Sequence, residues 1–425
     1  MFTTPRQTTL ALIALGSIAI GQSQTSVGTG RPLRPRAARS VPGQMVLSVL
    51  PGADGIAMIT AAGGTVLRTL DDQTFLLEID PGSPGAVNLG AHAGTNWTER
   101  NFLLAAPEVG ACGSTTGAGA QGCTIAFFDG DPAPERYYDQ PTTDIIDLGA
   151  AQDLSAGIPS IVAVIDTGID PDHALFAGRI FSSGYDFVDE DPAAWDIGNG
   201  IDDDDDGLID EAWGHGTHIA GIIALINPDA WILPLRVLDS DGNGSAFHVA
   251  LAIHAALDAG ADVINLSLGM SSYSHVVAQA IQRADELKVT VVTSAGNTAG
   301  RVLFPGRLDD VVTVAALDAN DIKADFSAFG PAVELSAPGL EIYSAMPGNA
   351  WAWWSGTSMS AAIVSGAVSL LHSVHGDPTE ADADDALGTT SVDIDSVNQS
   401  FEELLGDGRI DVAAGAQWIL TELGD

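Results

Sequence analysis

Four segments of this chain carry the side chains that acyl transfer through a serine requires. In chain order they supply a carboxylate, an imidazole, an amide and a hydroxyl: Asp166, His215, Asn297 and Ser358. A serine hydroxyl is a poor nucleophile until a base takes its proton. His215 could do this near neutral pH, because the ordinary pKa of histidine is about 6.5. The Asn297 amide, with the backbone N–H of Ser358, could bind the oxyanion that develops on the attacked carbonyl.

Each of these segments alone also has a structural interpretation. Asp-Thr-Gly is a common turn after a strand, and Gly-Thr-Ser is a common helix cap. A lone histidine is more often structural than catalytic, and His173 and His218 are interpreted in that way. The catalytic hypothesis therefore depends on all four segments occurring together and in order.

The surrounding patterns predict the elements that would position these residues. Continuous apolar runs at 160–165 and 289–293 predict buried parallel strands, and Asp166 directly follows the first of them. In open α/β sheets ligands bind at the carboxyl ends of the strands. The stretch 217–226 predicts a helix that the chain enters at His215.

Ser358 opens a second predicted helix, which is apolar, rich in small residues and extends to His372. Strand and helix patterns alternate from Ile161 through Val368, as doubly wound α/β folds require. A last helix is predicted at 412–423.

The chain order Asp, His, Ser resembles that of the subtilisin-like serine proteases, the subtilase family, over roughly residues 135–420. The resemblance implies that Asp166, His215 and Ser358 form a triad with Asn297 as the oxyanion donor. It also implies serine endopeptidase activity and a three-layer α/β/α sandwich around a mostly parallel, doubly wound sheet. The chain departs from the family at 362–364, where Ala-Ile-Val stands in place of Pro-His-Val, but this change removes no catalytic group.

Two further segments resemble the edges of the family's substrate cleft. An extended peptide inserted between such edges would pair main chain to main chain. The residues that the resemblance places there are Gly242, Asn243 and Gly244 on one edge, and Ser267, Leu268 and Gly269 on the other.

Acidic residues gather before the base. Asp202, Asp204, Asp206 and Asp210 have the alternating spacing that opens an EF-hand-like loop, although Trp213 replaces the usual glutamate at its twelfth position. Consecutive carboxylates repel one another, so the pattern favours a structural Ca²⁺ over a solvated acidic loop, which is the alternative. Asp189 and Asp191, with Asp186, resemble a second calcium site of some relatives.

Composition divides the chain into five predicted regions. Residues 1–23 are typical of a secretory signal peptide, and 24–43 are typical of a disordered linker. Residues 44–105 resemble the subtilase propeptide, a small α+β domain that assists folding and inhibits the enzyme; an ordinary N-terminal domain is the alternative. Residues 106–134 form a Gly-rich linker and 135–425 the catalytic domain.

The only cysteines, Cys112 and Cys123, lie in that Gly-rich linker. In an exported chain such a pair suggests a disulfide, with free thiols as the alternative.

The net charge limits the kinds of macromolecule that this chain could bind. The chain has 16 basic and 56 acidic residues, a net charge of −40, which disfavours electrostatic binding to nucleic acid or to anionic membranes.

We therefore expect a secreted, monomeric serine endopeptidase. It would act on protein or peptide substrates, with its own propeptide as inhibitor. A catalytically inactive subtilase-fold protein that serves as a binding or scaffold module is the alternative, and turnover of an unstructured protein distinguishes the two.

Overall fold

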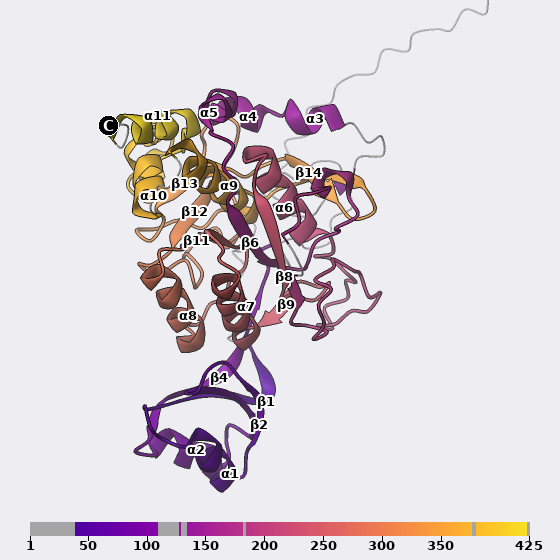
Figure 1. Cartoon of the computed structure of the whole chain (residues 1–425), viewed down its shortest axis with the longest axis vertical. Coiled ribbons are helices and arrows are strands. Elements are labelled where there is room, and N and C mark those ends of the chain that lie inside the picture. Colours follow the sequence, from indigo (N-terminus) through magenta and orange to yellow (C-terminus); the bar gives the residue numbers. More distant parts are fainter. Residues whose placement is uncertain (1–38, 109–126, 129–133, 182–183, 376–379, 423–425) are drawn as a thin grey trace, which may run out of the picture. The chain divides into compact units, whose positions relative to one another are not determined.

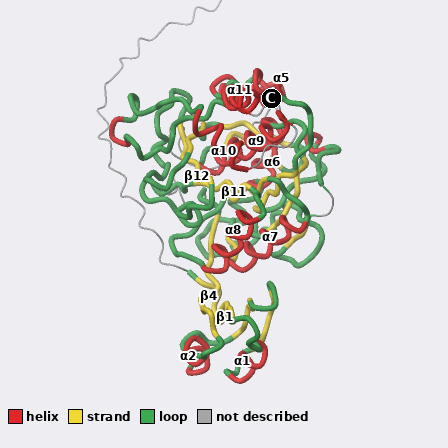
Figure 2. Tube along the Cα trace, turned by 60° about the vertical axis from the view of Figure 1, so that its left-hand side comes forward, coloured by secondary structure: helices red, strands yellow, loops and turns green. Residues whose placement is uncertain are grey.

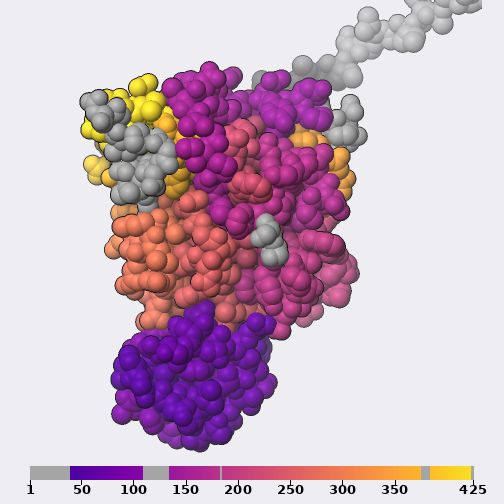
Figure 3. Space-filling view, viewed as in Figure 1, coloured from indigo at the N-terminus to yellow at the C-terminus, as the bar shows by residue number. Residues whose placement is uncertain are grey.

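The structure is a computed structural model that describes residues 39–108, 127–128, 134–181, 184–375 and 380–422. The predicted signal peptide at 1–23, most of the predicted linker at 24–43, and both cysteines lie outside the described residues. Residues 40–108, the N-terminal lobe, form an α+β unit with a core of its own (indigo in Figure 3). Residues 134–422, the α/β region, contain the other helices and the large parallel sheet.

The N-terminal lobe has two helices packed on an antiparallel sheet of strand order β2-β3-β1-β4 (Figure 1). Its elements are β1 Ser40–Val49, α1 Gly55–Ala61, β2 Thr65–Thr69, β3 Thr74–Glu78, α2 Pro84–Ala91 and β4 Thr95–Ala105. Leu47, Ile59 and Leu77 are among the fully buried side chains of its core.

The predicted strands and first helix of this lobe are present, with two differences. β1 begins at Ser40, four residues before the predicted start, so the end of the predicted linker is strand. The helix α2 was not predicted, because its alanines and glycines give a weak helical pattern. Ser83, which accepts a hydrogen bond from the backbone N–H of Ala86, and Pro84 at the first helical position are the signals that mark it.

The α/β region is built on a seven-stranded sheet of order β13-β12-β11-β10-β6-β8-β7, in which every neighbouring pair is parallel. Its strands are β6 Ile161–Asp166, β7 Tyr185–Asp186, β8 Trp231–Arg236, β10 Val263–Leu266, β11 Thr290–Ser294, β12 Val312–Leu317 and β13 Leu335–Pro338. The predicted parallel sheet is confirmed.

Helices cover both faces of this sheet, which gives the predicted three layers (Figure 2). Successive side chains of a strand point to opposite faces. Val162 and Val164 of β6 accordingly pack into one apolar cluster with α6 and α9, while Ala163 and Ile165 pack into another with α7 and α8. The helices are α5 Leu148–Leu154, α6 His215–Ile226, α9 Thr357–His375, α10 Glu380–Thr389 and α11 Val412–Glu422 in the first layer, and α7 Ala246–Asp258 and α8 His275–Glu286 in the second.

Smaller elements complete the region. These are β5 Phe127–Phe128, α3 Pro134–Tyr138, α4 Pro141–Ile145, β9 Asn243–Ser245, β14 Ile342–Met346, β15 Ala350–Trp354 and the 3₁₀ helices Ala174–Phe176 and Gln399–Phe401. Among the described residues one helix, α9, is long and apolar enough to cross a membrane. Since 94% of that window is buried inside the protein, α9 is better explained as a core helix.

Candidate active site

The predicted acid and base meet where β6 ends and α6 begins. Nδ1 of His215 lies 2.7 Å from Oδ1 of Asp166, and both side chains are fully buried. The next residue has to be glycine, because a Cβ on Gly216 would lie 2.1 Å from the carbonyl oxygen of Gly168. The small residue therefore lets the helix approach the end of the strand closely enough for this contact.

Ser358 is the second residue of α9, and its neighbour Thr357 fixes the predicted amide donor. Oδ1 of Asn297 accepts hydrogen bonds from the backbone N–H of Thr357 at 3.0 Å and from its hydroxyl at 2.9 Å. Because the amide oxygen is held in this way, Nδ2 is the part of the Asn297 amide that remains to donate to another group. The structure thus brings all four predicted residues together.

A fifth side chain lies among these four: Glu108, at the end of the N-terminal lobe. Its Oε2 accepts a hydrogen bond from Oγ of Ser358 at 2.9 Å and lies 3.1 Å from Nε2 of His215. Its Oε1 accepts from Nδ2 of Asn297 at 3.0 Å. A Cβ on Gly356 would lie 1.9 Å from this oxygen, so a glycine at that position leaves the space that the carboxylate occupies.

The sequence had assigned Glu108 to the Gly-rich linker 106–134, and this assignment is wrong for its first three residues. The extended chain of β4 continues past Ala105, and the backbone N–H of Ala106 donates to the carbonyl oxygen of Gly242 at 3.0 Å. No local signal marks Glu108, since what places it is a contact with residues 107 to 250 positions away.

Two buried histidines have opposite electrostatic surroundings. Burial alone would lower the pKa of His215, but Asp166 and then Glu108 outweigh it and raise that pKa to about 10. Burial lowers the pKa of His218 to about 3, and its Nε2 lies 3.2 Å from the carbonyl oxygen of Ala352. His215 is thus held as an imidazolium between two carboxylates, whereas His218 is a neutral structural residue, as predicted.

The two predicted substrate edges lie on either side of the chain's own segment 103–106. Ala105 exchanges two backbone hydrogen bonds with Gly269, of 3.1 and 2.9 Å. On the other side β4 pairs antiparallel with β9, with Leu104 opposite Gly244 and Ala105 opposite Asn243. Ser267 and Leu268 are buried, so this edge offers main chain to a bound strand.

A sequence model of the subtilase family matches residues 157–413, which is more than half of the chain. The chain belongs to the subtilase family. It is 37% identical to thermitase of Thermoactinomyces vulgaris over 234 residues, which are 52% of this chain and 78% of thermitase. It is 39% identical to the thermophilic serine proteinase of Bacillus sp. strain AK1 over 251 residues, but that match spans only 57% of the proteinase and 56% of this chain.

A solved structure has the same fold. It is the crystal structure of fervidolysin from Fervidobacterium pennivorans, a keratinolytic enzyme related to subtilisin. The TM-score is 0.70 at 23% sequence identity, and the match covers 90% of this chain and 62% of fervidolysin.

The structure brings together three of the four aspartates predicted as the first metal site of this subtilase. Carboxylate oxygens of Asp202, Asp204 and Asp206 lie within 4.8 Å of one another. Asp210 instead accepts backbone hydrogen bonds from Asn199 at 2.9 Å and Gly200 at 2.9 Å.

The residues of the second predicted metal site have other partners. Asp189 and Asp186 each lie 2.6 Å from Nη1 of Arg236, and Asp191 accepts from the backbone N–H of Ala193 at 2.7 Å. Arg236 therefore supplies the positive charge that a cation was predicted to supply there.

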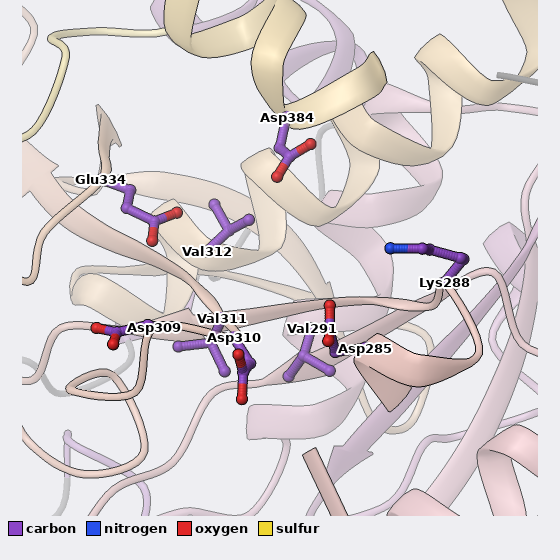
Figure 4. A pocket seen from close by; sticks show the side chains of 9 residues that line it. All are labelled: Asp285, Lys288, Val291, Asp309, Asp310, Val311, Val312, Glu334 and Asp384. Atoms are coloured by element: carbon purple, nitrogen blue, oxygen red, sulfur yellow. The ribbon is translucent and has the colours of Figure 1, made fainter. Parts of the chain in front are cut away.

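A cavity of about 230 Å³ lies away from the triad, at the amino ends of β11 and β12 (Figure 4). It is lined by Asp285, Lys288, Val291, Asp309, Asp310, Val311, Val312, Glu334 and Asp384. Because the strands are parallel, their amino ends lie at the opposite end of the sheet from their carboxyl ends, where Asp166 lies. The cavity is therefore not part of the active site.

Proposed function

We propose that this subtilase is an exported serine endopeptidase that is made as a precursor and cleaves itself to become active. The observation that carries the proposal is the convergence of three groups on one carboxylate: the imidazole of His215, the hydroxyl of Ser358 and the amide of Asn297. Gly356 leaves the space that this carboxylate occupies. A carboxylate resembles the acid product of peptide hydrolysis. A pocket that binds it with these groups is suited to the tetrahedral intermediate that leads to that product.

The proposed chemistry uses these side chains in the roles that their types allow. Oγ of Ser358 attacks the peptide carbonyl carbon while its proton passes to Nε2 of His215, and Nδ2 of Asn297 hydrogen-bonds the new oxyanion. His215 then gives the proton to the leaving amine, and water hydrolyses the acyl-enzyme in the same way. Asp166, bonded to Nδ1, holds the imidazole in the required tautomer and stabilises the imidazolium.

The substrates are extended protein or peptide chains. The segment 103–106 lies between the two edges as a third strand, and its bonds to Gly242 and Gly269 use main-chain groups alone. Main-chain pairing gives affinity with modest demands on sequence.

The N-terminal lobe acts as the inhibitory propeptide. Its β4 fills the substrate edges, and Glu108 blocks both the nucleophile and the oxyanion donor. A second buried carboxylate of the lobe, on β4, binds the start of α8: Glu99 accepts from the hydroxyl of Ser274 at 2.9 Å and from the backbone N–H groups of His275 and Val276 at 2.7 and 3.0 Å. Displacing the lobe would leave these donors without their partner, which favours the bound state.

The acidic loop holds a structural Ca²⁺. Calcium takes oxygen ligands at about 2.3–2.6 Å, so oxygens on one ion lie up to roughly 5 Å apart, and the Asp202, Asp204 and Asp206 oxygens meet that limit. Burial, and then Asp241, Asp206 and Asp204, raise the pKa of the neighbouring Glu211 to about 7, so this region has an excess of negative charge. When bound, the ion would neutralise that charge and hold the loop that leads to α6.

Export is the remaining part of the proposal. Residues 1–23 have the pattern of a signal peptide. One relative, 36% identical over 262 residues, is the cell wall-associated protease of Bacillus subtilis. An extracellular location would also supply calcium.

The decisive experiment is digestion of casein by the secreted protein, with the Ser358→Ala variant purified in the same way as the control. We expect wild type to degrade casein, and Ser358→Ala to leave it intact although it is folded. If wild-type protein freed of residues 1–108 leaves casein intact, the inactive binding or scaffold alternative is the better interpretation.

A further inference from the structure

A buried carboxylate outside the triad binds the first turn of α6 on both sides of His215. Asp196 is only 5% exposed to solvent. Its Oδ1 accepts a hydrogen bond from the backbone N–H of Gly214 at 3.0 Å. Its Oδ2 accepts from the backbone N–H of Thr217 at 3.2 Å and from the Thr217 hydroxyl at 2.7 Å.

The helix needs such a partner from outside. The first backbone N–H groups of an α-helix have no partner within the helix, and a side chain at the N-cap usually binds one of them. The N-cap of α6 is Gly214, which has no side chain to do this. Asp196 takes that role from 18 residues away, and its negative charge also suits the positive end of the helix dipole.

The same residue is also bound to the segment that follows the catalytic acid. The backbone N–H of Asp196 donates to the carbonyl oxygen of Ile169 at 3.3 Å, three residues after Asp166. The Thr217 hydroxyl that donates to Asp196 accepts a hydrogen bond from the backbone N–H of Asp170 at 3.0 Å. Asp196 therefore joins the end of β6, which carries the acid, to the start of α6, which carries the base.

We propose that Asp196 is a positioning residue that sets the distance and orientation of His215 relative to Asp166 and Ser358. The proposal rests on the endopeptidase function proposed above. Asp196 touches no reacting atom; it acts through the backbone on either side of the base. A displacement of about 1 Å at a reacting group can cost roughly 10²-fold in rate, so the effect should appear in kcat.

The titratable groups on the two segments that Asp196 joins are Asp166 and Asp170 on the β6 side, and His215 and His218 on α6. In the precursor Glu108 also faces His215. Burial, opposed by its three hydrogen bonds and reinforced by Asp166, raises the pKa of Asp196 to about 7. Asp196 therefore carries little charge at the pH where a histidine base becomes protonated, so its effect on His215 is exerted through its hydrogen bonds to the first turn of α6.

The test uses the mature enzyme with Asp196→Ala and Asp196→Asn, and Asp153→Asn on the exposed side of α5 as a matched control. We expect Asp196→Ala to lower kcat by about 10²-fold with little change in KM. Asp196→Asn, whose oxygen can still accept from Thr217, should lose less. The loss should appear in kcat at temperatures where each variant is fully folded, and Asp153→Asn should match wild type.

Two results would overturn the proposal: unchanged kcat in both variants, or a loss of activity that only follows the folded fraction of each variant. The second would mean that Asp196 supports the fold alone. If Asp196→Ala does not fold, Asp196→Asn decides the question by the same two measurements. Inactive wild-type enzyme would instead count against the endopeptidase function, so the two failures are distinguishable.

Discussion

At the scale of single residues, the strongest constraint is on Asn297. Its amide oxygen is bound twice by Thr357, so only Nδ2 can serve the oxyanion. We expect Asn297→Ala to keep the triad and lower kcat by about 10²–10³ with a small change in KM. Steady-state kinetics on a peptide amide check this. Near-wild-type kcat in a correctly folded Asn297→Ala enzyme would show that another donor binds the oxyanion.

Glu108 should control the protonation of the base in the precursor. In a Ser358→Ala background that prevents processing, Glu108→Gln removes one of the two carboxylates that hold His215 as an imidazolium. The pKa of His215, about 10 with Glu108 present, should therefore fall. NMR titration of the histidine ring protons measures it, with the exposed His92 as an internal control. An unchanged His215 pKa would mean that Asp166 alone sets it.

The same contact predicts a pH dependence of stability. The folded pKa of His215 lies above its ordinary value of 6.5, so its contribution is complete below pH 6.5 and is lost as pH rises toward about 10. The free energy of unfolding of the Ser358→Ala precursor should decline over that interval, and less steeply with Glu108→Gln. Urea unfolding at several pH values tests this. Equal slopes in the two proteins would contradict the proposed ion pair.

At the scale of elements, the acidic loop 202–206 should make stability depend on calcium. Binding to the folded state alone stabilises by about 2.7 kcal/mol when free calcium is 100 times Kd. Chelation should therefore lower the melting temperature and speed self-digestion. Asp204→Ala with Asp206→Ala should remove most of that response, whereas the exposed pair Asp309→Ala with Asp310→Ala should keep it.

Sodium provides the control for screening. High sodium reduces carboxylate repulsion but does not coordinate the oxygens in a fixed geometry, so it should not replace calcium fully. A melting temperature that chelation leaves unchanged after exhaustive removal of metal would favour a solvated acidic loop.

The elements that position the site could be predicted because their patterns are strong. The uninterrupted apolar runs form β6, buried except at Ile161, and β11, which is fully buried. α6 begins at His215, where the chain was predicted to enter that helix. α9 extends one residue earlier and three later than predicted, which is the usual uncertainty at helix ends. α2 was missed because its small residues give little periodicity.

The parts of the site that sequence did not predict are those fixed by contacts between distant segments. Glu108 lies beyond a predicted domain boundary, and only the pairing of β4 with β9 places it among the four groups. Asp196 lies between the two acidic groups predicted to bind cations and was not singled out, and its partners are backbone N–H groups and a hydroxyl. Neither contact has a signature in local spacing or composition.

At the scale of the whole molecule, the N-terminal lobe and the α/β region are joined by a continuous set of contacts that ends at the nucleophile. β4 pairs with β9, Glu99 binds the start of α8, and Glu108 reaches Ser358. The lobe also contributes side chains to the α/β core, since Leu104 and Ala106 belong to the same apolar cluster as α7 and α8. An intact precursor should therefore fold as one unit that cannot bind substrate.

Self-processing is the prediction that tests this arrangement as a whole. Because Ala105 and Ala106 occupy the substrate edges, the chain just beyond them is what the serine can reach. Wild-type secreted protein should begin C-terminal to Ala106, and Ser358→Ala protein should retain the N-terminal lobe. N-terminal sequencing and intact mass of the two proteins, produced side by side, measure this.

Asn297→Ala provides an intermediate case, in which the precursor should accumulate first and then convert slowly, since the triad is intact but the oxyanion is poorly stabilised. Identical N-termini in wild type and Ser358→Ala would show that another protease removes the lobe, and the contact of Glu108 with the triad would then have no part in maturation.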